Sequence, residues 1–448
     1  MLNRLLDRTR MASSHPALRL VSYLTIWVAY LAFMASHAPR GIGWLSWHLR
    51  RTYNAVEYLK INGYLSSYGF SIWSNCQDCG SPESFWDEKI YLSSNALKLA
   101  PYIFLNHFWG IDALQKYGPM IDRVVIFIAA AAAAELVIRC VRSYSPVAPY
   151  VVGVACLALF ATAPWTYKML LAGWVEVYFL MFFLLGLLFF AIERNRMACV
   201  MLFMAGVFHY QWAVAVAVFY CLLFVISRIV KADQGSQLYV PPYGRGGSGR
   251  MAIVLSLMIP PLVELSLRLL AQQTLTLTKG ASLLTRIGIS GNFTDTHNGG
   301  LLGALQFLGG NKVTHCLARV DSISGGLADG MTRYYCILSV TGMAALSLAA
   351  VAGLIILLKQ STPAKWIVFP LAYALLLFVT LLQQSLSVHL MGYSYIFSFL
   401  FAAGIVGLMV YFSKFIRSSA LSIALSIPCV VGIVLLSMRV SMLTDAYG

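Results

Sequence analysis

The stretch "SYIFSFLFAAGIVGLMVYFS", residues 394–413, contains 20 residues and no charged side chain. Because an α-helix needs about 20 mostly apolar residues to cross the hydrocarbon core of a bilayer, this stretch predicts a transmembrane helix. Similar runs recur from residue 17 to the end of the chain. Only 11% of the 448 residues are charged, whereas soluble domains average about 25%. The sequence therefore predicts an all-α polytopic membrane protein that forms a single membrane domain, residues 1–448.

Eleven apolar segments are predicted to be transmembrane helices. The first is long and follows a basic arm, so we interpret it as a span and not as a cleavable signal peptide. One region with basic residues at both ends is split at "FHYQW", residues 208–212, because it must cross the membrane and return. The eleven segments are residues 17–36, 122–141, 147–163, 171–192, 197–208, 212–229, 251–271, 334–358, 365–384, 394–413 and 418–438.

Basic residues in alternate short connections orient the chain. Arg139, Arg194, Arg228, Lys359 and Lys414 fall in such connections, and short loops rich in Lys and Arg favour the cytoplasm. The N-terminus is therefore predicted to be cytoplasmic and the C-terminus extracytoplasmic, in a bacterial inner membrane. The net charge of +15 follows from this topology and from contact with anionic membrane lipids. A nucleic-acid partner is accordingly not expected.

Two long loops are predicted on the extracytoplasmic side, residues 37–121 and residues 272–333. Loops longer than about 15 residues are usually functional or disordered, and neither of these has low complexity. The first is rich in tryptophan and tyrosine, which favours short interfacial helices with aromatic rings at the depth of the lipid headgroups. The rings expected at that depth are those of Trp86, Tyr91, Tyr102 and Trp109.

A polar helix is predicted to begin near residue 48, inside the first loop. Arg50, Asn54 and Glu57 are three or four residues apart, so their side chains can share one face. Asn62-Gly63 then predicts the end of this helix, since glycine is common just beyond a helix C-terminus. The polar face has two interpretations: a solvated side of an interfacial helix, or a general base beside a site for an anion.

Four short motifs accompany this layout of one span, a long outer loop and a second span. In these motifs, and in layout along most of its length, the chain resembles membrane glycosyltransferases of the GT-C fold. The motifs are "YLSSNA" at residues 91–96, "LKLAPYIFLNHFWGI" at 97–111, "APWTYK" at 163–168 and "GVFHYQW" at 206–212.

The resemblance implies an enzyme that transfers a sugar from a polyprenyl-phosphate-linked donor to an extracytoplasmic glycan, lipid or protein acceptor. Such a transfer needs a cation to stabilise the departing phosphate and a carboxylate to take the proton of the acceptor. The family presents an acid early in the polar helix, where this chain has Asn54, with Glu57 one turn later. The base is therefore expected to be Glu57, with Asp87 as the second choice and Glu88 as a further candidate.

The candidate phosphate ligands are two arginines near the outer face. Arg268 stands four residues after Glu264, so it either pairs with Glu264 on one helix face or binds a phosphate. Arg333 begins the eighth span and either binds a phosphate or anchors the helix end.

Other polar residues near the outer ends of spans complete the expected site. Glu176 lies inside the fourth span, where an acid is costly and therefore suggests a function. His209 and His389 are predicted at similar depth, and together with Asn54 and Glu88 they are expected to contact substrate. A divalent metal is possible, but the sequence offers no clear ligand set.

Two other functions fit the same composition. A polymerase or ligase of lipid-linked polysaccharide would also need outer basic residues and two large outer loops. A transporter of lipid-linked glycan would be expected to show repeat symmetry and charges at the bilayer centre, and no internal repeat is evident. A scaffold without catalysis is the third alternative, favoured if Asn54 replaces an essential acid.

Overall fold

The computed structural model describes most of the apolar segments and part of the first outer loop. The described residues are 16–37, 43–63, 70–73, 89–95, 99–142, 145, 147–166, 177–231, 247–274, 278–279, 330–381, 394–416 and 419–444. The remaining residues lie outside this description.

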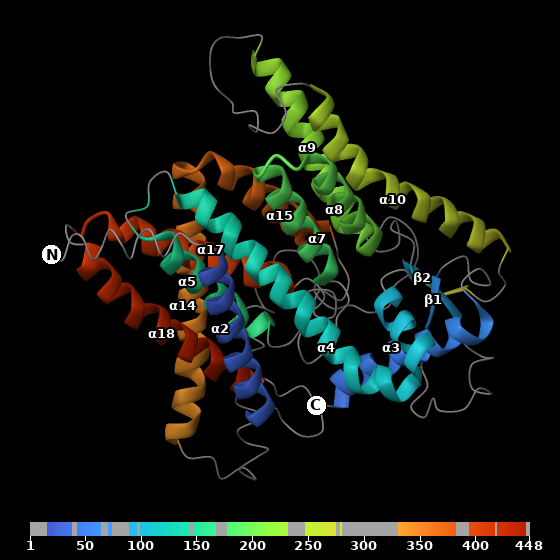
Figure 1. Cartoon of the computed structure of the whole chain (residues 1–448), viewed down its shortest axis with the longest axis horizontal. Helices are drawn as coiled ribbons and strands as arrows, with labels where there is room; N and C mark the ends of the chain where they lie inside the picture. The colour runs from blue at the N-terminus through green and yellow to red at the C-terminus, as the bar shows by residue number, and fades with distance from the viewer. Residues whose placement is uncertain are drawn as a thin grey trace.

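Helices make up nearly all of the described chain, with a small sheet beside them (Figure 1). The helices are α2 (Pro16–His37), α3 (Gly43–Asn62), α4 (Ala100–Val141), α5 (Pro149–Thr162), α7 (Val177–Ala191), α8 (Asn195–Phe208), α9 (Tyr210–Lys231), α10 (Gly247–Thr274), α14 (Gly330–Gln360), α15 (Thr362–Leu381), α17 (Ser394–Ser413) and α18 (Ser419–Thr444). The strands are β1 (Phe70–Trp73), β2 (Lys89–Asn95) and β3 (Thr278–Lys279).

Each of the eleven predicted apolar segments contains a helix in the structure. Among the described residues, four stretches are long and apolar enough to cross a membrane: Ala100–Val141, Met251–Ala271, Thr341–Gln360 and Tyr395–Ser413. Shorter apolar helices accompany them, α8 and α9 among them, and these two are separated at His209 as predicted. The helices thus have the length and composition of a membrane protein.

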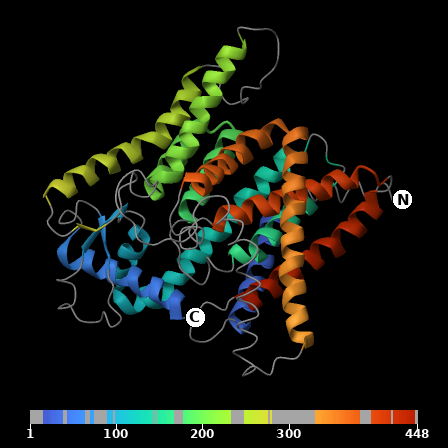
Figure 2. The ribbon, with the colours of Figure 1, turned by 180° about the vertical axis from the view of Figure 1, so that it is seen from behind.

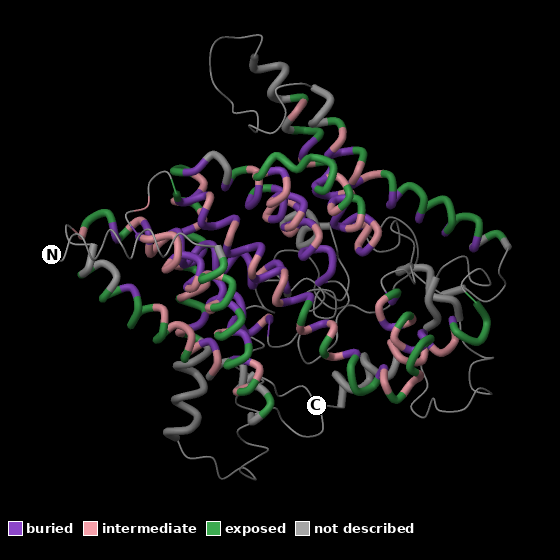
Figure 3. The backbone as a smooth tube through the Cα atoms, in the orientation of Figure 1, coloured by how far each residue is buried: buried purple, intermediate pink, exposed green. Residues whose placement is uncertain are grey.

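The buried centre of the bundle is formed by α4, α5, α7 and α17, which pack on one another (Figure 3). In α4 this packing depends on small side chains, because Ala129, Ala130, Ala133 and Ala134 are fully buried and let the neighbouring helices approach closely. By contrast, α10 and α18 expose much of their apolar surface, as helices in contact with lipid do.

A close helix crossing joins α14 to α17. An added Cβ atom at Gly353 would overlap the carbonyl oxygen of Gly404, and one at Gly404 would overlap that of Ala350. Glycine and alanine at such positions let two backbones touch, which is a common way for helices to associate in membranes.

A three-stranded sheet, absent from the sequence prediction, joins the two predicted outer loops. β1 pairs with β2 in antiparallel fashion, and β2 pairs with β3 in parallel. Because β2 belongs to the first predicted loop and β3 begins the second, the two loops meet at one end of the bundle. Views from the front and from behind place the sheet beside α3 and the C-terminal end of α10 (Figure 2).

The long helix α4 turns back on itself at Gly110, which has φ 80° and ψ 176°, outside the helical region. Tyr102 donates a hydrogen bond to Asp122, 20 residues later, and its ring lies against Gly118. A straight helix would separate residues 20 apart by about 30 Å. The first turns of α4 therefore fold over the following ones.

This turn gives different surroundings to two aromatic residues that were expected at headgroup depth. Tyr102, expected at headgroup depth, is only 1% exposed because the folded arm packs its ring against the protein. Trp109, directly before the turn at Gly110, is 62% exposed. Trp86 lies outside the described residues, and the side chain of Tyr91 is not described.

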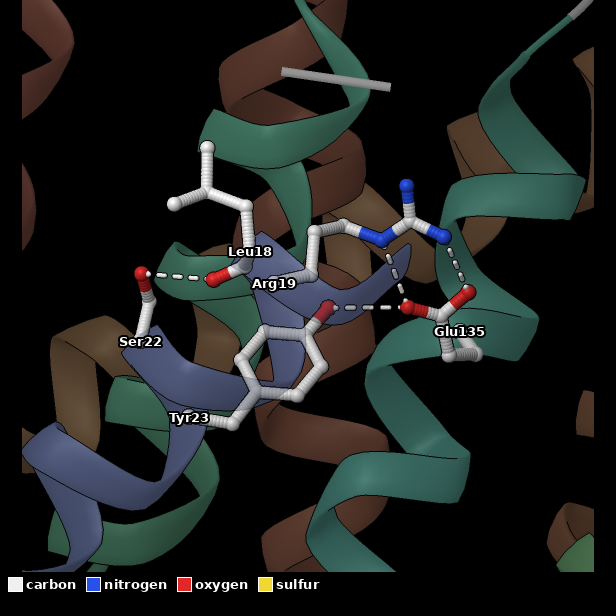
Figure 4. A network of polar contacts seen from close by, with 5 residues as sticks. All are labelled: Leu18, Arg19, Ser22, Tyr23 and Glu135. Atoms are coloured by element: carbon white, nitrogen blue, oxygen red, sulfur yellow. Dashed lines mark hydrogen bonds and ion pairs between the residues drawn. The ribbon is translucent and has the colours of Figure 1, made fainter. Parts of the chain in front are cut away.

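At the predicted cytoplasmic side, an ion pair ties α2 to α4 (Figure 4). Arg19 donates from Nε to Glu135 Oε1 over 2.8 Å and from Nη2 to Oε2 over 3.0 Å. Tyr23 adds a hydrogen bond to Oε1 over 3.2 Å. The two parallel bonds from the guanidinium are the strong geometry for an arginine and a carboxylate, so this contact fixes the register of the two helices.

Candidate functional site

Glu57 lies on α3, the polar helix predicted in the first loop. Ala55, Val56 and Leu59 of this helix are buried against the protein, while Asn54 and Glu57 are half-buried on its other side. The helix ends at Asn62, and Gly63 follows with φ 78° and an N–H bonded to the carbonyl of Leu59 over 2.9 Å. The predicted polar helix and its end at Asn62-Gly63 are confirmed, but the helix begins at Gly43, before the predicted start near residue 48.

The carboxylate of Glu57 is held by Asn106, on the folded arm of α4. Asn106 Nδ2 donates to Glu57 Oε1 over 2.6 Å, and Asn106 is only 1% exposed. A hydrogen bond to a charged group contributes about 1.5–3 kcal/mol, so this contact fixes the position of the carboxylate at the edge of the bundle.

Three further polar side chains surround this pair. Tyr102 donates its hydrogen bond to the buried Asp122, and Tyr53 of α3 lies near enough to Asp122 to be affected by its charge. Burial first, and then the negative charge of Asp122, raise the pKa of Tyr53 to about 12. Tyr53 therefore stays a neutral hydrogen-bond donor at any physiological pH. We call Tyr53, Glu57, Tyr102, Asn106 and Asp122 the α3–α4 cluster.

A second group of polar residues joins α9 to α10. Arg268 Nη2 donates to Glu264 Oε1 over 3.0 Å, which confirms the predicted pairing across one helical turn. Arg268 Nη1 donates to the hydroxyl of Tyr210 over 3.1 Å, and its guanidinium carbon lies 4.7 Å from the centre of the Tyr210 ring. Gln211 Nε2 also donates to that hydroxyl, over 3.0 Å. We call Tyr210, Gln211, Glu264 and Arg268 the Tyr210–Arg268 cluster.

Burial makes this second cluster energetically significant. Glu264 and Arg268 are 5% and 7% exposed. An unpaired charge in a transmembrane helix costs roughly 2.5–3.5 kcal/mol on insertion scales. Pairing offsets part of that cost, and loss of either partner would leave the other buried and uncompensated.

His209 has a structural role at the junction of α8 and α9. Its backbone leaves the helical region, with φ −153° and ψ 87°. Its Nδ1 accepts the backbone N–H of Trp212, three residues later, over 3.5 Å. A side chain that accepts this N–H acts as an N-cap and satisfies one of the otherwise unpaired donors at a helix start.

The start of α7 connects the two clusters. Tyr178 lies beside Tyr102 and Asp122 of the first cluster. Its ring stacks on Phe208 with centroids 4.9 Å apart, and Phe208 precedes His209 and Tyr210. Contacts thus run without a break from α4 through α7 to the α8–α9 junction.

Several predicted residues cannot be placed with these clusters. Asp87, Glu88, Glu176 and His389 lie outside the described residues, and Arg333 is in the first turn of α14 with its side chain undescribed. Of the predicted site residues with described side chains, Asn54 and Glu57 share α3, His209 caps α9, and Arg268 pairs with Glu264.

Sequence reasoning missed Asn106, Tyr102, Asp122, Tyr53 and Tyr210. One signal was available: Asp122 stands at the first position of a predicted span, where the argument applied to Glu176 also holds. Tyr102 and Asn106 are four residues apart and share a helix face, but only the turn at Gly110 reveals what that face contacts.

Across the described ranges, no three His, Cys, Asp or Glu side chains are grouped so as to hold a metal ion. Compared with protein-family models, with curated protein sequences and with solved structures, the chain matches none.

Proposed function

We propose that this chain is a membrane glycosyltransferase that takes a sugar from a polyprenyl-phosphate-linked donor and transfers it to a glycan, lipid or protein acceptor. The observation that supports it best is the Glu57 carboxylate, half-buried on α3 and held by Asn106 over 2.6 Å. It stands on the polar helix after the first span, one turn after Asn54, which occupies the position where the GT-C resemblance expects an acid.

In the proposed reaction, Glu57 is the general base. It takes the proton of the acceptor hydroxyl as that oxygen attacks the anomeric carbon, and the phosphate of the carrier leaves. Asp87 and Glu88 are the other candidates for this role. Arg268 and Arg333 are proposed to stabilise the charge that develops on the leaving phosphate. Asn54, Glu176, His209 and His389 are proposed to contact the substrates.

The proposed topology follows from the basic residues in alternate short connections. All eleven helical segments cross the membrane, with the N-terminus in the cytoplasm and the C-terminus outside, in a bacterial inner membrane. The two outer loops then meet the lipid carrier at the surface, and membrane lipids surround the apolar faces of α10 and α18.

A transfer assay tests the function directly. Purified protein is supplied with synthetic polyprenyl-phosphate sugars and acceptor extracts, and product formation is measured for wild type and for Glu57→Gln. Because general bases contribute about 10²–10⁴-fold, turnover of Glu57→Gln is expected to fall at least 100-fold. The matched control is Glu193→Gln, a change at an exposed acid in the turn between α7 and α8.

Two results would count against the proposal. Unchanged turnover in both Glu57→Gln and Asp87→Asn removes the assignment of the base. Activity with a soluble nucleotide sugar, and none with the lipid-linked donor, removes the donor class.

A further inference from the structure

The Tyr210–Arg268 cluster contains more hydrogen-bond donors than acceptors. The Tyr210 oxygen already accepts from Arg268 Nη1 and Gln211 Nε2, at 3.1 and 3.0 Å. Its own O–H is therefore left to donate. Arg268 Nε is buried and has no hydrogen-bond partner in the part of the chain that the structure describes. The cluster thus has two donors, the Arg268 Nε–H and the Tyr210 O–H, for which a further acceptor is needed.

Surplus donors around a buried guanidinium favour an anion. A buried donor without an acceptor costs free energy, and an anionic oxygen satisfies it best. The planar guanidinium, with its fixed set of N–H groups, suits the oxygens of a carboxylate or a phosphate. Glu264 provides one such oxygen, since its Oε1 receives a bond from Arg268 Nη2 over 3.0 Å.

The surroundings indicate that the anion carries an apolar tail. Arg268 lies within one turn of the end of the span Met251–Ala271, which leads toward β3 and the outer loops. On the same turns of α10, Leu265, Leu267 and Leu269 are 52%, 38% and 53% exposed. A lipid phosphate has a charged headgroup at the edge of the bilayer and a hydrocarbon chain within it. It therefore matches a buried arginine near the end of a span with exposed leucines beside it.

We propose that Glu264 is a resident counter-ion: it neutralises Arg268 in the unliganded protein and gives up the guanidinium when the phosphate of a lipid carrier binds. The phosphate oxygens then accept from Arg268 and from the Tyr210 hydroxyl. No covalent bond forms or breaks in this exchange. The inference rests on the proposed use of a lipid-phosphate donor and names Tyr210 and Glu264 as additional residues of its site.

Binding of a polyprenyl phosphate that carries no sugar tests this exchange. In purified full-length protein, Glu264→Gln removes the negative charge but keeps the shape of the side chain. Because a neighbouring like charge is lost, affinity is expected to rise about tenfold. If Glu264 only stabilises the fold, affinity stays the same or falls, and the proposal is overturned.

Tyr210→Phe provides a second variant, which keeps the ring against Arg268 and removes only the hydroxyl. A hydrogen bond to a charged oxygen is lost, so affinity is expected to fall about tenfold or more. Unchanged affinity would overturn the role of Tyr210, and with it the proposed site, even if Glu264→Gln does not fold.

The matched control is Glu135→Gln, which breaks a second arginine–glutamate pair of the described residues, Arg19–Glu135. This variant is expected to bind polyprenyl phosphate like wild type. Inorganic phosphate and a polyprenol without phosphate are the control ligands. Equal affinity for inorganic phosphate would contradict a lipid site, as would equal affinity for the polyprenol.

These measurements separate the inference from the proposed function. Binding is recorded without a sugar, so Glu57→Gln is expected to bind the polyprenyl phosphate normally while failing in transfer. If transfer is confirmed but Glu264→Gln binds no more tightly, only the inference fails. If binding responds as expected but no sugar is transferred, the proposed function fails and the phosphate site stands.

Discussion

At the scale of single residues, Tyr53 of the α3–α4 cluster makes the stability of the protein depend on pH. Its pKa is raised from 10 to about 12, by burial and then by the charge of Asp122. The folded state therefore retains a proton that the unfolded chain loses between about pH 10 and pH 12, so stability falls as pH rises through that window. Below pH 10 both states are protonated, and Tyr53 contributes no pH dependence.

The Tyr53→Phe variant is expected to lose part of this alkaline destabilisation. The measurement is thermal unfolding of wild type and variant in detergent from pH 8 to pH 12, and the two curves should diverge only above about pH 10. Tyr117→Phe, at an exposed tyrosine of α4, is the control and should follow wild type. Divergence between wild type and Tyr53→Phe that is already present at pH 8 and constant to pH 12 would contradict the prediction.

The spacing of residues along the chain predicted contacts within one helix, but it did not predict contacts between residues far apart in the sequence. The pairing of Glu264 with Arg268 follows from their spacing of four residues on one helix. The structure confirms it, with a distance of 3.0 Å between Glu264 Oε1 and Arg268 Nη2. Tyr210 is 58 residues away from Arg268 in the chain, so no periodicity in the sequence indicates their contact. The same holds for Asn106 and Glu57, which are 49 residues apart.

At the scale of elements, the turn at Gly110 decides whether the α3–α4 cluster forms. Its φ of 80° and ψ of 176° fall in a region that is essentially restricted to glycine. Gly110→Ala is therefore expected to destabilise the protein by about 1–3 kcal/mol and to weaken the contacts of Tyr102 and Asn106 with Asp122 and Glu57. Thermal unfolding and sugar transfer are the two measurements.

The control for this turn is Gly432→Ala, in the helix α18. An added Cβ atom there meets nothing within 4 Å, and alanine is favoured over glycine in a helix by roughly 0.5–1 kcal/mol. Gly432→Ala should therefore leave stability unchanged or increase it. Equal behaviour of the two variants would show that backbone strain at Gly110 does not matter.

Helices were predictable from the sequence to the extent that burial in lipid dictates their composition. α17 occupies residues 394–413 in both prediction and structure, because an apolar run of that length has few other folded states in a membrane. The sheet was not predicted. β1 and β3 contain only four and two residues, too few for an alternating pattern to be recognised.

At the scale of the whole molecule, the proposed orientation makes opposite predictions for the two ends of the bundle. Cysteines are introduced at two exposed positions, Lys60 on α3 and Arg194 in the turn between α7 and α8, in a chain whose nine native cysteines are replaced by serine. A membrane-impermeant thiol reagent added to spheroplasts should label Lys60→Cys at once. It should label Arg194→Cys only after the membrane is permeabilised. The reverse pattern would invert the topology and move the α3–α4 cluster to the cytoplasm.

The pairing of β2 with β3 also constrains how the protein is made. A ribosome adds about 5–20 residues per second, so Thr278 is synthesised roughly 10–40 s after Asn95. During that interval the edge of β2 that later meets β3 has no neighbour, and unpaired strand edges invite association with other chains. Completion of the sheet thus waits until α10 has been translated, and a nascent chain stalled before that point would expose an unpaired strand edge to the biogenesis machinery.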